Sequence, residues 1–156
     1  ILGVFGNFKG VEHRLEFVEN INGIDFINDS KGTNVDSTIW ALNNMTKPVV
    51  LIAGGRDKNS DYSVIRNLIK EKVKFIVAIG EAKDKIKNNF RDIVSLEEAS
   101  SLEEAINLGF RKATSGDSVL LSPMCASFDM FSNYEERGRI FKDLVRKLKQ
   151  NSYATK

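Results

Sequence analysis

Short, continuous apolar runs alternate along the chain with segments in which apolar residues recur every three or four positions. Two of these runs are rich in β-branched residues and have the length of strands buried on both faces of a sheet. They cover 48–53 and 73–79, and shorter runs that also favour strands cover 93–94 and 118–121. These runs predict the central strands of a sheet.

Asn22-Gly23 separates two further β-rich runs, 14–19 and 24–28. Both residues of an Asn-Gly pair tolerate positive φ, which a two-residue hairpin turn requires. The sequence therefore predicts a β-hairpin ahead of the first helix.

Segments with helical periodicity lie between the strands. Ser101 and Glu104 match a capping box that opens one helix, whose apolar residues fall on a single face. Helices are predicted over 35–44, 62–71, 82–89 and 102–112, and a last helix begins between Ser127 and Asn133 and runs to about Lys149.

The order of these elements predicts the fold class. Strands and helices in alternation indicate a parallel sheet with right-handed crossovers and helices on both faces. With the hairpin added, we expect an α/β domain of three layers, Rossmann-like, with a mostly parallel sheet and an N-terminal β-hairpin.

Composition narrows the class of protein. The 156 residues suffice for one domain with a full core, and a single cysteine excludes an internal disulfide, as is usual in a reducing compartment. With a net charge of +2 and no basic stripe, nucleic acid is a poor candidate partner. No apolar run approaches the roughly 20 residues that span a bilayer, and no signal peptide is recognisable. We therefore expect a cytoplasmic protein with no membrane partner.

The chain begins at Ile1 rather than at a methionine. N-terminal processing would explain this, and so would a longer protein of which this chain is a piece. We expect 1–9 to be a linker from a preceding domain, 10–150 to be the domain itself, and 151–156 to be a frayed tail.

Three loops that follow predicted strands carry polar groups. Ligands of open α/β sheets bind beyond the carboxyl ends of the strands, so these loops can meet at one edge. They are 29–34, 54–58 and 122–127, and they offer two lysines, several hydroxyls and exposed glycine backbone. That combination favours an anionic ligand.

Each loop also has a purely structural interpretation. Residues 29–34 could form a turn with Asn34 as a helix cap, and Gly54-Gly55 could serve only the close packing of a helix on a strand. Cys125 is expected to be a small buried apolar residue. His13 is the one histidine, which excludes a histidine-based metal cluster, and it is expected to be a half-exposed strand residue.

Familiar catalytic motifs give no alternative site. The sequence holds no G-x-G-x-x-G fingerprint after a strand and no Walker A loop. A hydrolase built on Ser127 and His13 would need a G-x-S-x-G elbow, which is also missing.

Four ordered motifs in this sequence resemble those of the Mur ligases. They are 10–16, 28–34, 54–58 and 121–131, and the segment 133–138 (Asn-Tyr-Glu-Glu-Arg-Gly) is similar to the family's N-[FY]-x-x-R-G signature. Within the family, the motifs are most similar to those of the members that add D-glutamate to UDP-N-acetylmuramoyl-L-alanine.

The resemblance implies the C-terminal, amino-acid-binding domain of a three-domain, ATP-dependent ligase of peptidoglycan synthesis. In this family a substrate carboxylate is phosphorylated to an acyl phosphate, and the amino group of the incoming amino acid displaces the phosphate. The implied partners are ATP, D-glutamate and UDP-N-acetylmuramoyl-L-alanine. ATP and Mg²⁺ are implied to be bound mainly by a central domain outside these residues, so this chain is expected to be inactive alone. It is also expected to be monomeric.

The resemblance also assigns roles in amino-acid binding. Thr33 and Lys58 match positions that hold one carboxylate of D-glutamate, and a cation with a hydroxyl suits that group. Ser127 and the backbone of Tyr134 match positions that hold the other carboxylate, where an N–H near a helix start suits an anion.

Arg14, Asp29 and Lys31 match positions that face the nucleotide. A carboxylate there can bind ribose hydroxyls, and Lys31 is implied to be catalytic because a cation can meet phosphate charge as it develops. No metal ligand is implied in this domain.

Some alternatives remain open at this stage. Arg56-Asp57 departs from relatives that carry an acid and a glycine before the lysine, which leaves the reach of Lys58 undetermined. The chain could also be a related Mur ligase domain, the similar last domain of a folylpolyglutamate synthase, or a stand-alone α/β binding module. The ligases that add lysine or diaminopimelate carry an Asp-Asn-Pro-Arg loop, which does not occur here. The loop at 122–127 argues against the synthase.

Overall fold

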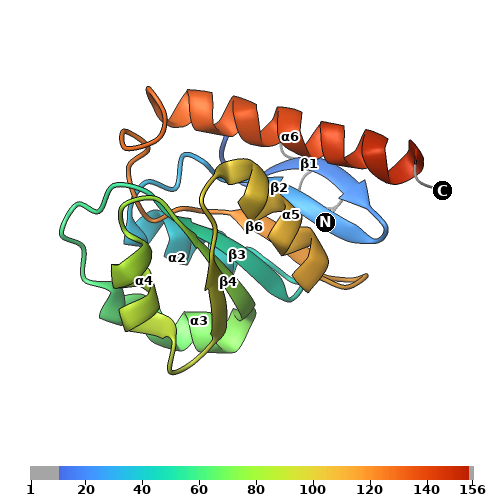
Figure 1. Cartoon of the computed structure of the whole chain (residues 1–156). Helices are drawn as coiled ribbons and strands as arrows, with labels where there is room; N and C mark the ends of the chain where they lie inside the picture. The colour runs from blue at the N-terminus through green and yellow to red at the C-terminus, as the bar shows by residue number, and fades with distance from the viewer. Residues whose placement is uncertain (1–10, 155–156) are drawn as a thin grey trace.

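A six-stranded sheet forms the middle layer of the domain (Figure 1). The computed structural model describes residues 11–154. The strand order is β1-β2-β6-β3-β4-β5; β1 is antiparallel to β2, and the other neighbouring strands are parallel. The strands are β1 (Glu16–Ile21), β2 (Ile24–Asn28), β3 (Val49–Gly54), β4 (Val73–Ile79), β5 (Ser95–Glu98) and β6 (Ser118–Leu121).

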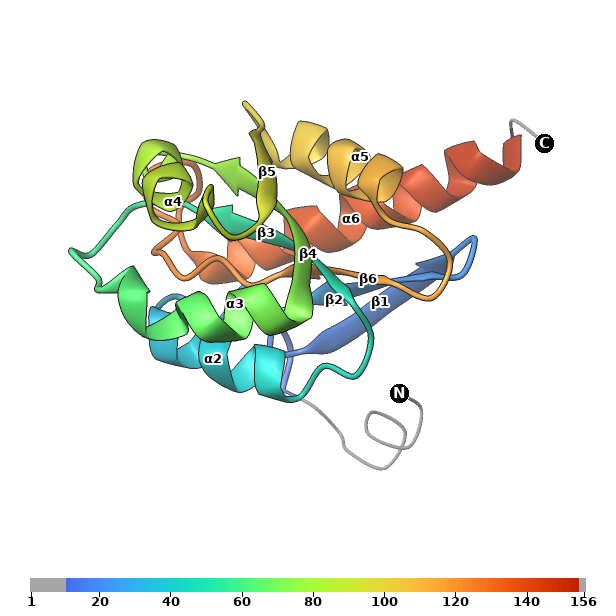
Figure 2. The same ribbon diagram turned by 90° about the horizontal axis from the view of Figure 1, so that it is seen from below.

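Helices cover both faces of this sheet. One face carries α2 (Val35–Asn43), the 3-10 helix η1 (Tyr62–Ile65), α3 (Arg66–Lys72) and α4 (Lys83–Phe90), and the other carries α5 (Leu102–Lys112) and α6 (Tyr134–Ala154). Figure 2 shows α2 and α3 on one side of the strands and α5 with α6 on the other. The three-layer α/β architecture with a mostly parallel sheet and an N-terminal hairpin is therefore confirmed.

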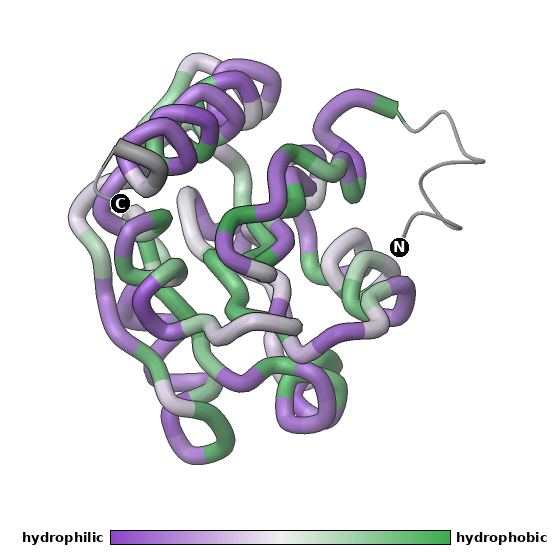
Figure 3. Tube along the Cα trace, turned by 90° about the vertical axis from the view of Figure 1, so that its right-hand side faces the viewer, coloured by the Kyte–Doolittle hydropathy of each residue, from purple (hydrophilic) through white to green (hydrophobic). Residues whose placement is uncertain are grey.

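The sheet separates two apolar cores. Successive residues of a strand point to opposite faces, so Leu51 packs in the core under α2 to α4 and Ile52 packs in the core under α5 and α6. Every residue of β3 is buried, as expected of a central parallel strand. The tube in Figure 3 accordingly carries its apolar segments mostly inside and polar turns on the outer helices. Among the described residues, no helix is both long enough and apolar enough to cross a membrane.

Several boundaries differ from the sequence-based prediction. The first strand begins at Glu16 rather than Arg14, because His13 and Leu15 have positive φ values of 69° and 42° and cannot continue a strand. The segment 93–94 is a turn and not a strand, since the N–H groups of Ile93 and Val94 both donate to the Phe90 carbonyl. The strand predicted there starts two residues later.

The last helix begins one residue after the predicted interval and ends later than predicted. It starts at Tyr134, where the Asn133 side chain accepts a hydrogen bond from the Glu136 N–H at 2.8 Å. It continues to Ala154, beyond the predicted end near Lys149. The linker predicted over 1–9 and the final residues 155–156 lie outside the described residues.

Candidate functional site

Three loops meet at the edge where β2, β3 and β6 end, on the left in Figure 1. Arg56 and Ala126 exchange backbone hydrogen bonds of 2.9 and 3.1 Å, which join the loop after β3 to the loop after β6. The Met124 N–H donates to the Gly32 carbonyl at 2.9 Å, which adds the loop after β2. These backbone bonds fix the three loops relative to one another, as a shared binding edge requires.

A pocket of about 320 Å³ opens between these loops and the first turn of α6. The four residues predicted to bind the amino acid all line it, namely Thr33, Lys58, Ser127 and Tyr134. Its other lining residues are Ala126, Phe128, Asn133 and Glu135. Thr33, Lys58 and Ser127, which lie 25 to 94 positions apart in the sequence, thus converge on one cavity, as the sequence predicted.

Several polar groups of this pocket lack partners within the described residues. The hydroxyls of Thr33 and Ser127 make no hydrogen bond there, although Ser127 is only 2% exposed, and the exposed Lys58 forms no ion pair. Tyr134 is the first residue of α6, so its N–H has no acceptor inside the helix. Unsatisfied donors that line one cavity are suited to an anionic ligand.

The residues that precede Lys58 explain how it comes to line the pocket. Arg56 turns to Glu81, with its Nε 3.2 Å from a carboxylate oxygen. Asp57 turns the other way and accepts hydrogen bonds from the Tyr62 hydroxyl at 2.8 Å and from Lys85 at 2.8 Å. Since both side chains are engaged elsewhere, the Arg56-Asp57 departure does not keep Lys58 from the pocket.

Arg137 is a central residue of the site, although the sequence analysis identified it only as part of the 133–138 signature. Its side chain is 1% exposed and donates to the Ser30 hydroxyl at 2.9 Å, the Ser30 carbonyl at 2.8 Å and the Cys125 carbonyl at 3.3 Å. The Ser30 hydroxyl in turn donates to the Tyr134 carbonyl at 2.7 Å. Arg137 therefore ties two of the loops to the start of α6.

No carboxylate among the described residues lies within ion-pair distance of Arg137. Burial lowers the pKa of its guanidinium to about 10, so the group stays charged at neutral pH. The carboxylates of Asp129 and Asp29 favour its charged form from beyond ion-pair distance.

Asp29 lies directly behind the same loops. It is 2% exposed; one carboxylate oxygen accepts from the Leu15 N–H at 3.1 Å and the other accepts from the Ser122 hydroxyl at 2.7 Å. Burial is the main reason that the pKa of this carboxyl rises to about 6. A Cβ on Gly32 would come within 2.6 Å of Asp29 Oδ2, so the loop can fold over this carboxylate only with glycine there. As it stands, Asp29 connects the loops and presents little surface to a ligand.

The other residues predicted to face a nucleotide, Arg14 and Lys31, lie beside the pocket and do not line it. The Arg14 guanidinium lies 5.0 Å from the ring centroid of Trp40, which is 44% exposed on α2. The Lys31 backbone donates to the His13 carbonyl at 2.9 Å, and its side chain forms no ion pair within 11–154. Neither of these two cations is among the residues that line the pocket.

His13 is buried and lies outside any strand, so the expectation of a half-exposed strand residue is wrong. Only 3% of it is exposed, and its ring meets the Tyr134 ring edge-on at a centroid distance of 6.1 Å. Asn28 Nδ2 lies 2.9 Å from His13 Nδ1, and burial lowers the pKa of the imidazole. An amide donor at Nδ1 requires that nitrogen to accept, which puts the proton of the neutral ring on Nε2.

His13 also belongs to the one group of three possible metal ligands that the described residues contain, with Glu12 and Glu16. Lys142 already lies between the two carboxylates, 2.7 Å from Glu12 and 3.2 Å from Glu16. The ammonium offsets one of the two negative charges and occupies the space between them, and an imidazole is not a ligand that Mg²⁺ prefers. This group therefore does not fit a magnesium site.

Cys125 is completely buried, as the sequence predicted. Burial raises the pKa of its thiol to about 11. Its sulfur lies 3.3 Å from the Tyr62 hydroxyl oxygen, whose single proton goes to Asp57, so the thiol is the donor. Its surroundings are those of a structural cysteine.

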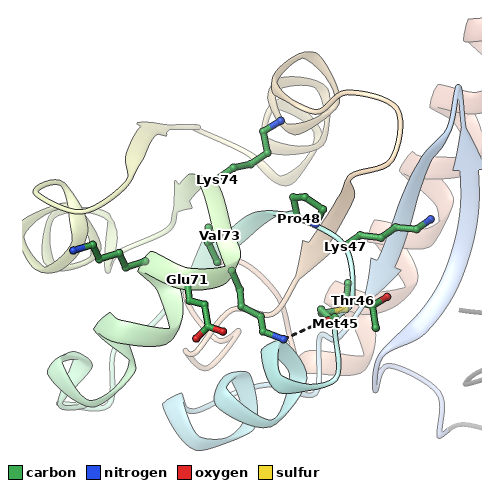
Figure 4. Close-up of a pocket in the computed structure, with 9 residues that line it drawn as sticks. Met45, Thr46, Lys47, Pro48, Glu71, Val73 and Lys74 are labelled. Carbon is green, nitrogen blue, oxygen red and sulfur yellow. Dashed lines mark hydrogen bonds between the residues drawn. The ribbon is translucent and has the colours of Figure 1, made fainter.

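A larger hollow of about 460 Å³ lies at the opposite end of the sheet, before β3 and β4. Figure 4 shows Lys47 and Lys74 pointing in different directions there, neither of them toward the other. Lys47 pairs with Asp25 and Lys74 pairs with Asp117, each at 2.7 Å. Two of the four lysines that line this hollow are thus neutralised, and a third, Lys72, donates to the Met45 carbonyl at 3.0 Å, so the smaller pocket is the better candidate site.

Comparisons with known proteins agree with this choice. The family model described as "Mur ligase, glutamate ligase domain" matches residues 13–125. The chain is 52% identical over 142 residues to a UDP-N-acetylmuramoylalanine–D-glutamate ligase of Chloroherpeton thalassium, which covers 91% of this chain and 30% of the relative. It is 55% identical over 141 residues to the ligase of the same name from Chlorobaculum parvum, covering 90% of this chain and 30% of that protein.

The chain thus spans about 30% of the length of the curated relatives that it matches. Among solved structures, a pseudomurein peptide ligase type C from Methanothermus fervidus superposes with a TM-score of 0.68 at 13% identity, over 92% of this chain and 30% of that one. At that identity the likeness concerns the fold alone.

Proposed function

The chain belongs to the Mur ligase family, and from this we propose that it is the C-terminal, amino-acid-binding domain of an ATP-dependent ligase that joins D-glutamate to UDP-N-acetylmuramoyl-L-alanine. Two relatives at 52% and 55% identity carry the name of that ligase, which favours it over ligases for other amino acids and over a folylpolyglutamate synthase. A stand-alone binding module is disfavoured for the same reason.

One observation carries the proposal: the pocket lined by Thr33, Lys58 and Ser127 gathers donors that have no partner within the described residues. D-glutamate brings two carboxylates. Lys58 with the Thr33 hydroxyl would bind one, and the Ser127 hydroxyl with the Tyr134 N–H would bind the other. A pocket of about 320 Å³ is ample for a five-carbon amino acid.

The reaction that we propose for the whole enzyme needs the amino group of bound D-glutamate next to an acyl phosphate of the precursor. The nitrogen lone pair forms the new C–N bond, the bond from carbon to the phosphate oxygen then breaks, and a proton leaves the amine. Negative charge develops on the carbonyl oxygen and the departing phosphate. Lys31, half-buried and without an ion pair in the described part of the chain, would stabilise that charge.

A nucleotide would approach the side of the pocket that carries Arg14 and Lys31. Asp29 is assigned there by resemblance, and its small exposed fraction means that its larger contribution would be to hold the loops. ATP and Mg²⁺ would be bound mainly by a central domain. Within 11–154 the cluster of Glu12, His13 and Glu16 is unsuited to Mg²⁺, so no step here depends on a metal in this domain.

The proposal extends to the organisation of the chain. Residues 1–9 would link it to that central domain, 10–150 would form the amino-acid-binding domain, and 151–156 would be its C-terminal end, of which 151–154 continue α6. We further propose a monomeric, cytoplasmic enzyme whose partners are D-glutamate, ATP and the UDP-linked precursor.

The test is to join the chain to the two upstream domains of a relative and to measure phosphate release. D-glutamate, L-glutamate, lysine and diaminopimelate would be compared as acceptors with UDP-N-acetylmuramoyl-L-alanine and ATP. We expect turnover with D-glutamate alone. Turnover with another acceptor, and none with D-glutamate, would reject the proposed function.

A further inference from the structure

The pocket that would hold the amino acid has one acidic residue among its described lining residues, Glu135. The rest of its polar lining consists of the Lys58 ammonium, the Thr33 and Ser127 hydroxyls and the Asn133 amide. A site built only for a dicarboxylate gains nothing from a negative side chain, because like charges repel. Glu135 therefore calls for a ligand group that is positive.

The neighbouring Glu136 has a clear structural role that Glu135 lacks. Glu136 accepts a hydrogen bond from the Ser132 N–H at 3.0 Å, and its own N–H donates to Asn133 at 2.8 Å, so the pair forms a capping box at the start of α6. Glu135 accepts no hydrogen bond and forms no ion pair within 11–154, although it is partly buried. Its carboxylate is thus available to a ligand in the pocket.

The lining residues of the pocket include charges of both signs, those of Lys58 and Glu135. An amino dicarboxylic acid has two carboxylates and one ammonium group, and the pocket offers two sets of donors and one acceptor of full charge. We infer that Glu135 binds the α-ammonium group of the incoming amino acid and so selects amino dicarboxylic acids over plain dicarboxylic acids. This inference rests on the proposed function, because it assigns the third group of the same ligand.

A purely local role for Glu135 has a different signature. A carboxylate in the first turn of a helix is favoured by the helix dipole, and its loss would loosen the start of α6. That effect would weaken the binding of every ligand to the same extent, since Tyr134 and Asn133 lie in the same segment. Only a direct bond to the ammonium distinguishes ligands that carry the amine from ligands that do not.

The experiment is an NMR titration of the ¹⁵N-labelled chain with D-glutamate and, separately, with glutarate, which has the same two carboxylates but no amine. The variants are Glu135→Gln and, as a control with the same change of charge, Glu71→Gln, whose side chain is exposed on α3 at the far end of the sheet. We expect Glu135→Gln to weaken D-glutamate binding about 10-fold, as for the loss of a charge-assisted hydrogen bond. Glutarate should bind the variant as well as the wild type or more tightly, and Glu71→Gln should change neither affinity.

The outcomes separate this inference from the proposed function. If Glu135→Gln weakens both ligands equally, or neither, Glu135 does not bind the ammonium, while the pocket keeps its proposed role. If glutarate and D-glutamate both leave the resonances of Thr33, Lys58 and Ser127 unchanged in the wild type, the proposed function fails and the inference fails with it.

Discussion

A Cβ placed on Gly138 would lie 2.1 Å from His13 Nδ1. The imidazole of His13 packs directly onto the backbone of α6 at this point, one turn after Tyr134 at the rim of the pocket. The contact joins the segment that leads into β1 to the helix that closes the site. It also explains why glycine follows arginine in the Asn133–Gly138 signature.

Gly138→Ala should therefore destabilise the domain even though alanine favours helices. The added methyl must displace the His13 ring, and we expect a loss of about 1–3 kcal/mol in the free energy of unfolding. Urea denaturation measures it. Gly109→Ala in α5 is the matched control, because its Cβ would lie 3.2 Å from a Val119 methyl, which a small shift relieves. Equal effects of the two substitutions would contradict the close contact.

Arg137→Met should be more damaging than its position near a helix start suggests. It removes three hydrogen bonds and leaves the Ser30 and Cys125 carbonyls buried without that donor, so we expect a loss of about 3 kcal/mol. Arg139 lies two residues further along α6 and is exposed, so Arg139→Met should change the unfolding free energy by less than about 0.5 kcal/mol. Chemical denaturation of both variants gives the comparison, and a stable Arg137→Met protein would refute the tethering role.

The raised pKa of Asp29 predicts an unusual pH dependence. Because its folded-state pKa of about 6 lies above the ordinary value of 3.8, the stability linked to its protonation is present below about pH 4 and is lost as the pH rises through 6. Relative to Asp29→Asn, the wild type should lose up to about 3 kcal/mol between pH 4 and pH 7. Denaturation of both proteins at the two pH values measures this difference, because the contributions of the other acidic groups are the same in both and cancel. A difference that does not vary with pH would show that Asp29 titrates normally.

Lys58→Ala should act on amino-acid binding rather than on folding. In the three-domain enzyme we expect the Michaelis constant for D-glutamate to rise about 10-fold or more with little change in kcat, because an exposed cation that contacts the substrate contributes mainly to binding. Lys70→Ala, which removes a lysine at the other end of the sheet, is the control. An unchanged Michaelis constant in Lys58→Ala would remove this residue from the site.

Cys125 should resist alkylation as long as the domain is folded. Its thiol is fully buried with a pKa of about 11, so it is neutral and inaccessible at pH 8. We expect iodoacetamide to label it only through opening of the fold, at a rate that increases with urea. Mass spectrometry follows the reaction, and rapid labelling of the native protein would mean that the loops around Arg137 open freely.

Local sequence patterns were sufficient for most of the fold. Apolar runs, the Asn22-Gly23 turn and the capping box at Ser101 depend on neighbours within a few residues, so β2, β4, β6 and α5 appear where the sequence predicts them. The same logic fails at β5, where the apolar pair Ile93-Val94 packs as a turn against the core and the strand itself carries mostly exposed residues.

The candidate site divides in the same way. The sequence assigned Thr33, Lys58, Ser127 and Tyr134 through motifs, and the order of parallel strands predicts that their loops share an edge. The sequence did not predict the roles of Arg137 and Glu135. The role of Arg137 depends on carbonyl groups 12 and 107 residues away, and the role of Glu135 depends on its having no partner within the described residues.

The sequence by itself therefore determined the order of strands and helices, the hairpin, the edge at which the loops meet and the family to which they are similar. Those features follow from backbone preferences and periodicity, which act over short stretches of chain. Only the tertiary structure decided that His13 is buried against Gly138, that Asp29 faces inward and that the buried Arg137 joins the loops. Burial and pairing depend on what distant segments bring into contact, and no local pattern encodes that.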